Sequence, residues 1–117
     1  MLVERRPDER HPLLHGDVLV IALHGQLIVG NRQALKQRVL DDIEAGTRKV
    51  VVDFANTGYI DSSGLGVLVS LAKRLRELGG DLRLANLNAD LRTLFELTKL
   101  DSLFQIADSR DQALASF

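Results

Sequence analysis

The stretch VVVDFANTGYIDSSGLGVLVSLAKRL, residues 50–75, decides the fold that we predict for this chain. Its three leading valines are typical of a strand that lies inside a sheet and is covered on both faces. From Leu65 to Leu75, apolar residues recur at the spacing of one helical face, and basic residues occupy the opposite face. A buried strand followed by such a helix is half of a strand–helix–strand unit, and this unit predicts a parallel sheet.

The flanking segments continue this alternation along the 117 residues. Apolar runs between glycine or charged residues predict the strands, and apolar residues at helical spacing predict the helices. Strands are expected at residues 17–25, 49–54, 81–87 and 103–107, and helices at residues 32–46, 62–78, 89–98 and 109–117. The predicted fold class is α/β, with a small mixed, largely parallel sheet of four to five strands and about four helices.

Polar residues at the predicted helix starts are expected to act as caps, because a side-chain oxygen can accept a free backbone N–H there. Asn31 is placed to cap the first helix, and either Asn88 or Asp90 is placed to cap the third. Asp108, with Asp111 three residues further on, resembles a capping pair for the last helix.

The N-terminal residues 1–12 are charged and carry both prolines, so they are expected to form a short strand or a loose tail. The segment 11–17 is compatible with a hairpin arm whose turn holds Gly16 and Asp17. Residues 13–117 are expected to form one domain, because hydrophobic residues make up 45% of the chain and are spread along its length.

Charge and composition argue against several classes of function. With 15 basic and 16 acidic residues the net charge is −1, so the basic excess that favours nucleic-acid binding is absent. The longest apolar runs have strand length, which predicts no membrane insertion. The N-terminus lacks the apolar core of a signal peptide, so we expect a cytoplasmic protein. Without cysteine, the chain has no disulfide and no thiol nucleophile.

No enzyme motif is complete in this sequence. The glycine-rich loop ending in Lys-Ser/Thr, which holds phosphates in nucleotide hydrolases, is missing. Ser62 or Ser63 would need a histidine base to act as a nucleophile, and the G-x-S-x-G elbow is absent. His24, at the end of a neighbouring strand, stays open as such a base, with no feature that supports it. We therefore expect no catalytic residue and no cofactor.

The remaining histidines and acids do not predict a metal site. His11 and His15 are four residues apart, but Pro12 disfavours the helix that would bring them onto one face. Asp53, near the end of the strand predicted at residues 49–54, and Asp61 are separated by a loop, and we interpret them as a pair of carboxylates exposed to solvent at one strand end.

The segment DSSGLG, residues 61–66, admits two interpretations. Asp61 and the serines are preferred at helix starts, so the segment could be a simple cap. However, Gly64 and Gly66 fall in the first helical turns, where glycine costs up to about 1 kcal/mol relative to alanine. We expect them to leave the backbone open to a partner. A phosphate on Ser62 would face free N–H groups and the positive helix end, which stabilise an anion.

Together with GGDLRLANL and LFELTKLDSLFQIADSRDQALASF further on, the opening stretch resembles the STAS domain of bacterial anti-sigma factor antagonists. The resemblance covers about residues 17–117 and implies a small sheet with helices packed largely on one side. It also implies that Ser62, directly after the aspartate, is phosphorylated by an anti-sigma factor that is an ATP-dependent serine kinase. The unphosphorylated form would bind that anti-sigma factor and free a sigma factor, and a phosphatase would restore it.

One loop departs from the family. Many members carry an acidic G-E-L-D after the second strand, whereas this chain has GQLIVGN at residues 25–31, with Gln26 and Ile28 in place of the acids. The resemblance implies that this loop forms a second contact patch, and the substitutions leave the identity of the partner and phosphorylation itself open. A monomer or a weak dimer is expected. The predicted partner-binding residues are Asp61, Ser62, Ser63, Gly64, Gly66, Gln26, Ile28 and Asn31.

Two other functions remain open at this point. STAS-like domains also occur as constitutive subunits of signalling scaffolds and of lipid-transport ATPases, and the apolar pair Ile28-Val29 in the contact loop is compatible with such docking. A nucleotide hydrolase is the third alternative, although the sequence shows neither a phosphate loop nor a supported base.

Overall fold

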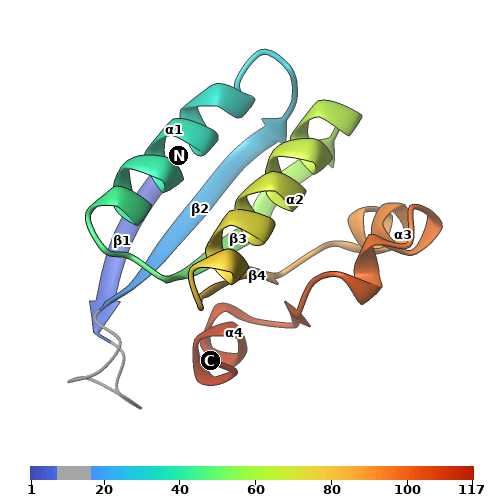
Figure 1. The fold of residues 1–117 in the computed structure, drawn as a ribbon. Helices are drawn as coiled ribbons and strands as arrows, with labels where there is room; N and C mark the ends of the chain where they lie inside the picture. The colour runs from blue at the N-terminus through green and yellow to red at the C-terminus, as the bar shows by residue number, and fades with distance from the viewer. Residues whose placement is uncertain (8–16) are drawn as a thin grey trace.

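The computed structural model describes residues 1–7 and 17–117. One sheet holds five strands in the order β1-β2-β3-β4-β5, in which only β1 runs antiparallel to its neighbour. The predicted fold class is therefore confirmed (Figure 1). The elements are β1 (Leu2–Pro7), β2 (Asp17–Leu27), α1 (Arg32–Glu44), β3 (Lys49–Ile60), α2 (Ser62–Glu77), β4 (Asp81–Ala85), α3 (Ala89–Leu97), a 3-10 turn (Leu100–Ser102), β5 (Ile106–Ala107) and α4 (Arg110–Ala115).

The helices cover the two faces of the sheet unequally. Figure 1 shows α1 and α2 side by side over one face, and α4 is separate from them. This follows from the strand order, because right-handed crossovers between successive parallel neighbours return on the same side of the sheet. Alternate residues of the strands serve the two faces: Leu19, Ile21, Val50 and Val52 join the large core under α1 and α2, and Val18, Val20 and Val51 pack with Ala113 of α4.

The N-terminus contributes an edge strand, which is one of the two expected outcomes. β1 pairs with β2 from Leu2 opposite Ala22 to Pro7 opposite Asp17. The hairpin arm predicted at residues 11–17 lies outside the described residues except for Asp17, and so do His11 and His15.

Strand β3 is longer than predicted. The sequence indicated a strand ending at Phe54, but β3 continues to Ile60 beside an equally extended β2, whereas its pairing with β4 stops at Asp53. Thr57 and Ile60 are buried in this extension, and the Thr57 hydroxyl donates a hydrogen bond to the carbonyl of Leu23 at 3.0 Å. The register of β2 and β3 shifts twice, between Ala22 and His24 and between Gly25 and Gln26. Beyond Asp53 these two strands pair, among the described residues, only with each other, and we call this two-stranded extension the ribbon.

The C-terminal part differs from the prediction in two details. Ser109, not Asp108, caps α4: its hydroxyl accepts the N–H of Gln112 at 3.1 Å. Asp108 instead forms an ion pair with Arg92 of α3 at 2.5 Å. The last strand is confined to Ile106–Ala107 rather than spanning residues 103–107.

Candidate functional site: a surface formed by two loops beside Ser62

Two loops meet at the carboxyl ends of β2 and β3. The N–H of Asp61 donates to the carbonyl of Leu27 at 3.1 Å, and the Asp61 carboxylate accepts the N–H of Val29 at 3.0 Å. These bonds hold the residues after β2 against the start of α2. We call residues 26–31 and 59–66 together the Ser62 surface. It lies at the end of the central strand, where open α/β sheets commonly bind their ligands.

Asp61 is the link between the two loops. One carboxylate oxygen caps α2 by accepting the N–H of Gly64 at 2.8 Å, and the other accepts the N–H of Val29. The Gly64 bond is the main reason why the pKa of Asp61 lies below its ordinary value, and the N–H groups of Val29 and Ser63 and the charge of Arg32 add to it against an opposing effect of burial. Asp61 is therefore ionised at neutral pH, and its carboxylate accepts hydrogen bonds from the backbone N–H groups of Val29 and Gly64.

Ser62 is the exposed first residue of α2. Within the described part of the chain its hydroxyl forms no hydrogen bond, so no protein group holds it. Ser63, the next residue, is half-buried. The arrangement presents one accessible hydroxyl on a helix start that backbone hydrogen bonds hold in place.

The two glycines of the motif have different environments. Gly64 is buried, and a Cβ on it would lie 2.5 Å from the carbonyl oxygen of Leu27 and 2.9 Å from Cγ2 of Ile60. The expectation that Gly64 leaves backbone open to a partner is therefore wrong, because this glycine lets α2 pack against the end of β2. Gly66 is exposed, with nothing within 4 Å of the position of a Cβ, as an open surface requires.

Asn31 shapes the loop rather than capping α1. Its side-chain oxygen accepts the N–H of Ile28 at 2.9 Å, and its side-chain nitrogen donates to the carbonyl of Gln26 at 2.7 Å. It makes no side-chain cap bond to α1, so the predicted cap is wrong. These bonds fold the loop so that the Gln26 side chain is exposed and Ile28 is half-buried.

Two large apolar side chains lie exposed on the Ser62 surface. Val29 is 62% exposed and Tyr59 is 56% exposed. Tyr59 pairs with Gln26 across the ribbon, which places it next to the contact loop. Tyr59 was not predicted as a site residue, although an aromatic residue two positions before Asp61 was a signal that could have found it.

Asp53 does not form a solvent-exposed pair with Asp61, contrary to our interpretation. It is only 4% exposed and accepts hydrogen bonds from Asn86, Arg110 and the N–H of Ala55, each at 2.9 Å. Burial by itself raises the pKa of Asp53, but these hydrogen bonds and the charge of Arg110 outweigh burial and hold it below its ordinary value. The carboxylate anchors α4 to the sheet.

The structure adds no support for enzyme chemistry. His24 is exposed on the ribbon opposite Asn56, and no hydrogen bond joins it to Ser62 or Ser63. Among residues 1–7 and 17–117 no group of three or more His, Asp or Glu residues is arranged to hold a metal ion. None of the helices described in these ranges has both the length and the apolar character needed to cross a membrane.

Comparison with known proteins identifies the family. The family model described as the STAS domain matches residues 13–113. The chain belongs to the STAS domain family. The STAS chain is 35% identical over 100 residues to BtrV of Bordetella bronchiseptica, with 86% of each chain covered. BtrV carries the provisional name of an anti-sigma factor antagonist. It is 30% identical over 87 residues to the anti-sigma-B factor antagonist of Bacillus subtilis, with 74% of this chain and 79% of the relative covered.

Solved structures share the fold of the STAS chain. A Thermotoga maritima protein, also provisionally named an anti-sigma factor antagonist, superposes with a TM-score of 0.86 at 24% identity over 98% of this chain and 92% of its own. The phosphorylated form of the Bacillus cell fate determinant SpoIIAA superposes with a TM-score of 0.71 at 16% identity, with 98% of both chains covered. The resemblance to the STAS domains of anti-sigma factor antagonists is thereby confirmed.

Proposed function

We propose that this STAS chain is an anti-sigma factor antagonist that binds an anti-sigma factor through the Ser62 surface, and that phosphorylation of Ser62 prevents this binding. The observation that carries the proposal is the exposed Ser62 hydroxyl, which has no hydrogen bond among the described residues and lies beside the contact loop. Relatives that bear the name of anti-sigma factor antagonist support the binding role.

The electrostatics of the helix start explain how such a switch works. A phosphate adds a charge of about −1.5 to −2 at neutral pH. The free N–H groups and the dipole of α2 stabilise this charge by about 0.3–1 kcal/mol at an exposed position, so the fold tolerates it. A partner that covers the Ser62 surface would have to desolvate the same charge, which can cost several kcal/mol. Binding is lost without a change of shape.

The partner implied by this function is an anti-sigma factor that is also a serine kinase, with a phosphatase that restores the binding form. When Ser62 is unmodified, the anti-sigma factor is captured and its sigma factor is released. The exposed Val29 and Tyr59 supply apolar area beside the hydroxyl, which a partner would bury. The phosphorylated structure of SpoIIAA shows that a protein of this fold can carry the modification.

The test is incubation with ATP and each kinase-type anti-sigma factor encoded in the native genome, followed by intact-mass measurement. We expect one phosphate on the wild-type chain and on Ser63→Ala, and none on Ser62→Ala. The phosphorylated chain should bind the same anti-sigma factor at least about tenfold more weakly in calorimetry. A chain that binds an anti-sigma factor without ever accepting phosphate would keep the antagonist role and remove the switch.

A second candidate function is a constitutive STAS subunit of a signalling scaffold or of a lipid-transport ATPase. The observation that favours it is the neutral and apolar character of the contact loop, with Gln26 and Ile28 in place of acids and Val29 exposed. In that case no kinase would modify Ser62, and the chain purified from its native host would carry no phosphate and would bind the partner as well as Ser62→Ala does.

A further inference from the structure

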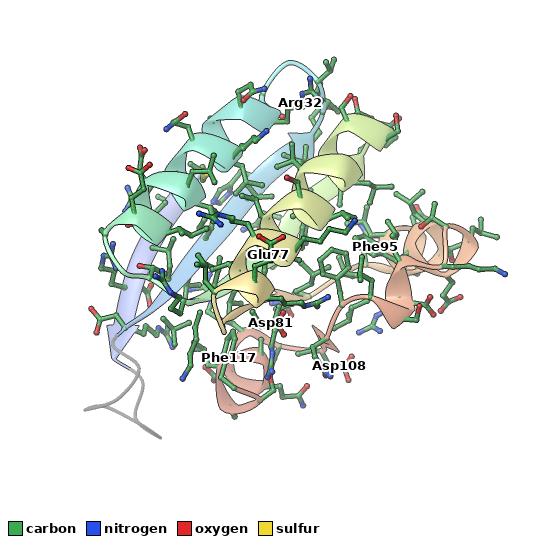
Figure 2. The ribbon with its side chains drawn as sticks, viewed as in Figure 1. Arg32, Glu77, Asp81, Phe95, Asp108 and Phe117 are labelled. Atoms are coloured by element: carbon green, nitrogen blue, oxygen red, sulfur yellow. The ribbon has the colours of Figure 1, made fainter. Side chains whose placement is uncertain are left out.

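Arg32, the first residue of α1, has an unsatisfied polar atom next to the Ser62 surface. Among the described residues, its Nε is the one buried side-chain nitrogen or oxygen that has no hydrogen-bond partner. Such atoms are rare in folded proteins, because burying a donor without an acceptor costs about 1–3 kcal/mol. Figure 2 shows Arg32 at the end of the molecule where α1 and α2 begin.

Asp61 is the nearby acid, yet it does not satisfy this guanidinium. The backbone places Arg32 near this acid, because its N–H donates to the carbonyl of Ile28 at 2.9 Å and the adjoining Val29 donates its N–H to the Asp61 carboxylate at 3.0 Å. The charge of Arg32 contributes to the lowered pKa of Asp61, but no ion pair joins the two side chains within 4.0 Å. The oxygens of Asp61 already accept the N–H groups of Val29 and Gly64. The Arg32 side chain therefore belongs to the loop beside the start of α2, and no group among residues 1–7 and 17–117 accepts a hydrogen bond from its Nε.

We propose that Arg32 is the built-in receptor for a phosphate on Ser62, and that it binds the phosphate oxygens in the same molecule and so joins the starts of α1 and α2. This inference rests on the proposed function, because it concerns the regulation of the same serine. Phosphorylation would supply the missing acceptor one residue after Asp61.

The guanidinium suits this role by its chemistry. A planar fork of N–H donors matches phosphate oxygens two at a time, and such charge-assisted bonds are stronger than neutral ones. A positive charge at this place also offsets the repulsion between the phosphate and Asp61, both of which are negative. In the phosphorylated form the phosphate would then be paired with Arg32 of the same molecule, in addition to the charge that it brings to the surface.

The test uses this chain alone, with phosphoserine installed at position 62 during translation so that no kinase is needed. The second ionisation of the phosphate, near pH 6 in the free residue, is followed by the pH dependence of its ³¹P NMR shift. A neighbouring cation favours the dianion, so Arg32→Gln should raise this pKa, by about 0.5 unit or more. Arg32→Lys keeps the charge without the fork, and should give an intermediate value.

Lys36 supplies the matched control. It lies one turn further along α1, so Lys36→Gln removes the same charge at a greater distance from Ser62. We expect it to shift the phosphate pKa by no more than about 0.2 unit. Equal shifts for Arg32→Gln and Lys36→Gln would overturn the proposal, because the phosphate would then feel only the general positive charge of α1.

A second measurement follows the Nε–H group of Arg32 directly. In ¹⁵N–¹H spectra, the Arg32 Nε–H signal should move downfield and exchange more slowly with water when phosphoserine is present. An unchanged signal would contradict the proposal. If Arg32→Gln instead weakens anti-sigma factor binding by the unmodified chain and leaves the phosphate pKa unchanged, Arg32 serves the partner and the proposal fails. A chain that no kinase modifies would defeat the proposed switch without affecting these NMR results.

Discussion

Two carboxylates on or just after β3 are fixed in opposite ways. Asp53 is buried and held mainly by side chains, with Asn86 from the loop after β4 and Arg110 from α4 as donors. Asp61 is held by the backbone of Val29 and Gly64 and belongs to the Ser62 surface. Side-chain donors tie distant segments of the chain into one core. Backbone donors fix a loop and leave its side chains free, which is what a recognition surface requires.

We call Asp53, Asn86 and Arg110 together the Asp53 cluster. The largest change in the free energy of unfolding is expected on the Ser62 surface, and it shows whether this surface is packed as firmly as that cluster. Gly64→Ala places a methyl group against the carbonyl of Leu27, so it should lower the free energy of unfolding by about 3 kcal/mol in urea titrations. Gly66→Ala is the matched control. It meets open space and should stabilise the chain by up to about 1 kcal/mol. Equal effects of the two substitutions would show that the helix start is loosely packed.

The next effect concerns the Asp53 cluster. Asp53→Asn leaves Arg110 without its charged partner and should lower the free energy of unfolding by about 2 kcal/mol at pH 7. The pKa of Asp53 is lower in the folded than in the unfolded state. Its carboxylate therefore stabilises the fold at pH values above its unfolded-state pKa, about 3.9, and this stabilisation is lost as the pH falls through its folded-state pKa. The stability gap between wild type and variant should therefore narrow below about pH 4. A gap that stays constant down to pH 2 would mean that the ion pair is not its source.

A smaller loss is expected from the contact loop. Asn31→Ala removes the bonds to Ile28 and Gln26, and should lower the free energy of unfolding by about 1 kcal/mol. Amide hydrogen exchange at Ile28 should become faster, because its N–H loses its acceptor. Gln33→Ala, at an exposed position of α1, is the control and should change the stability by less than about 0.5 kcal/mol. Unchanged exchange at Ile28 would show that the loop is held by something else.

The smallest effect on stability is expected at Ser62 itself, where the effect on binding is large. Ser62→Asp should change the free energy of unfolding by less than about 0.5 kcal/mol, because the side chain is exposed. The same variant should bind the anti-sigma factor at least about tenfold more weakly, whereas Ser62→Ala should keep its affinity. A strong destabilisation by Ser62→Asp would favour the reading of DSSGLG as a structural cap alone.

The sequence was sufficient for the architecture because the relevant signals are local. Valine runs, helical spacing from Leu65 to Leu75 and the glycines after the helices predict strands and helices from neighbouring residues alone. The prediction ended β3 too early because Asn56 and Gly58 interrupt the strand signal. The hydroxyl of the buried Thr57 donates its hydrogen bond to Leu23 on another strand, and the sequence of β3 alone does not show this. A strand that is lengthened by pairing with a neighbouring strand, as β3 is by pairing with β2, cannot be predicted from its own sequence alone.

The sequence led to Ser62 as an accessible residue at the start of α2, and the structure places it there, exposed. The residues that hold the surrounding surface in place were not predicted. The roles predicted for Asn31 as a helix cap and for Gly64 as an open backbone position were wrong, since their contacts are with backbone atoms of the neighbouring loop and strand. Asp53 was misread because its partners Asn86 and Arg110 are far away in the sequence. Arg32 gave no motif at all, and only the three-dimensional structure shows that its Nε lacks an acceptor.

The borders of the sheet have a consequence for how this protein meets others. On one side β5 offers only two residues, and on the other β1 carries the charged run Glu4, Arg5 and Arg6. Neither border is a good template for an incoming strand, and this discourages both edge-to-edge aggregation and recognition by β-augmentation. We therefore expect copies of this chain not to polymerise through the edges of their sheets.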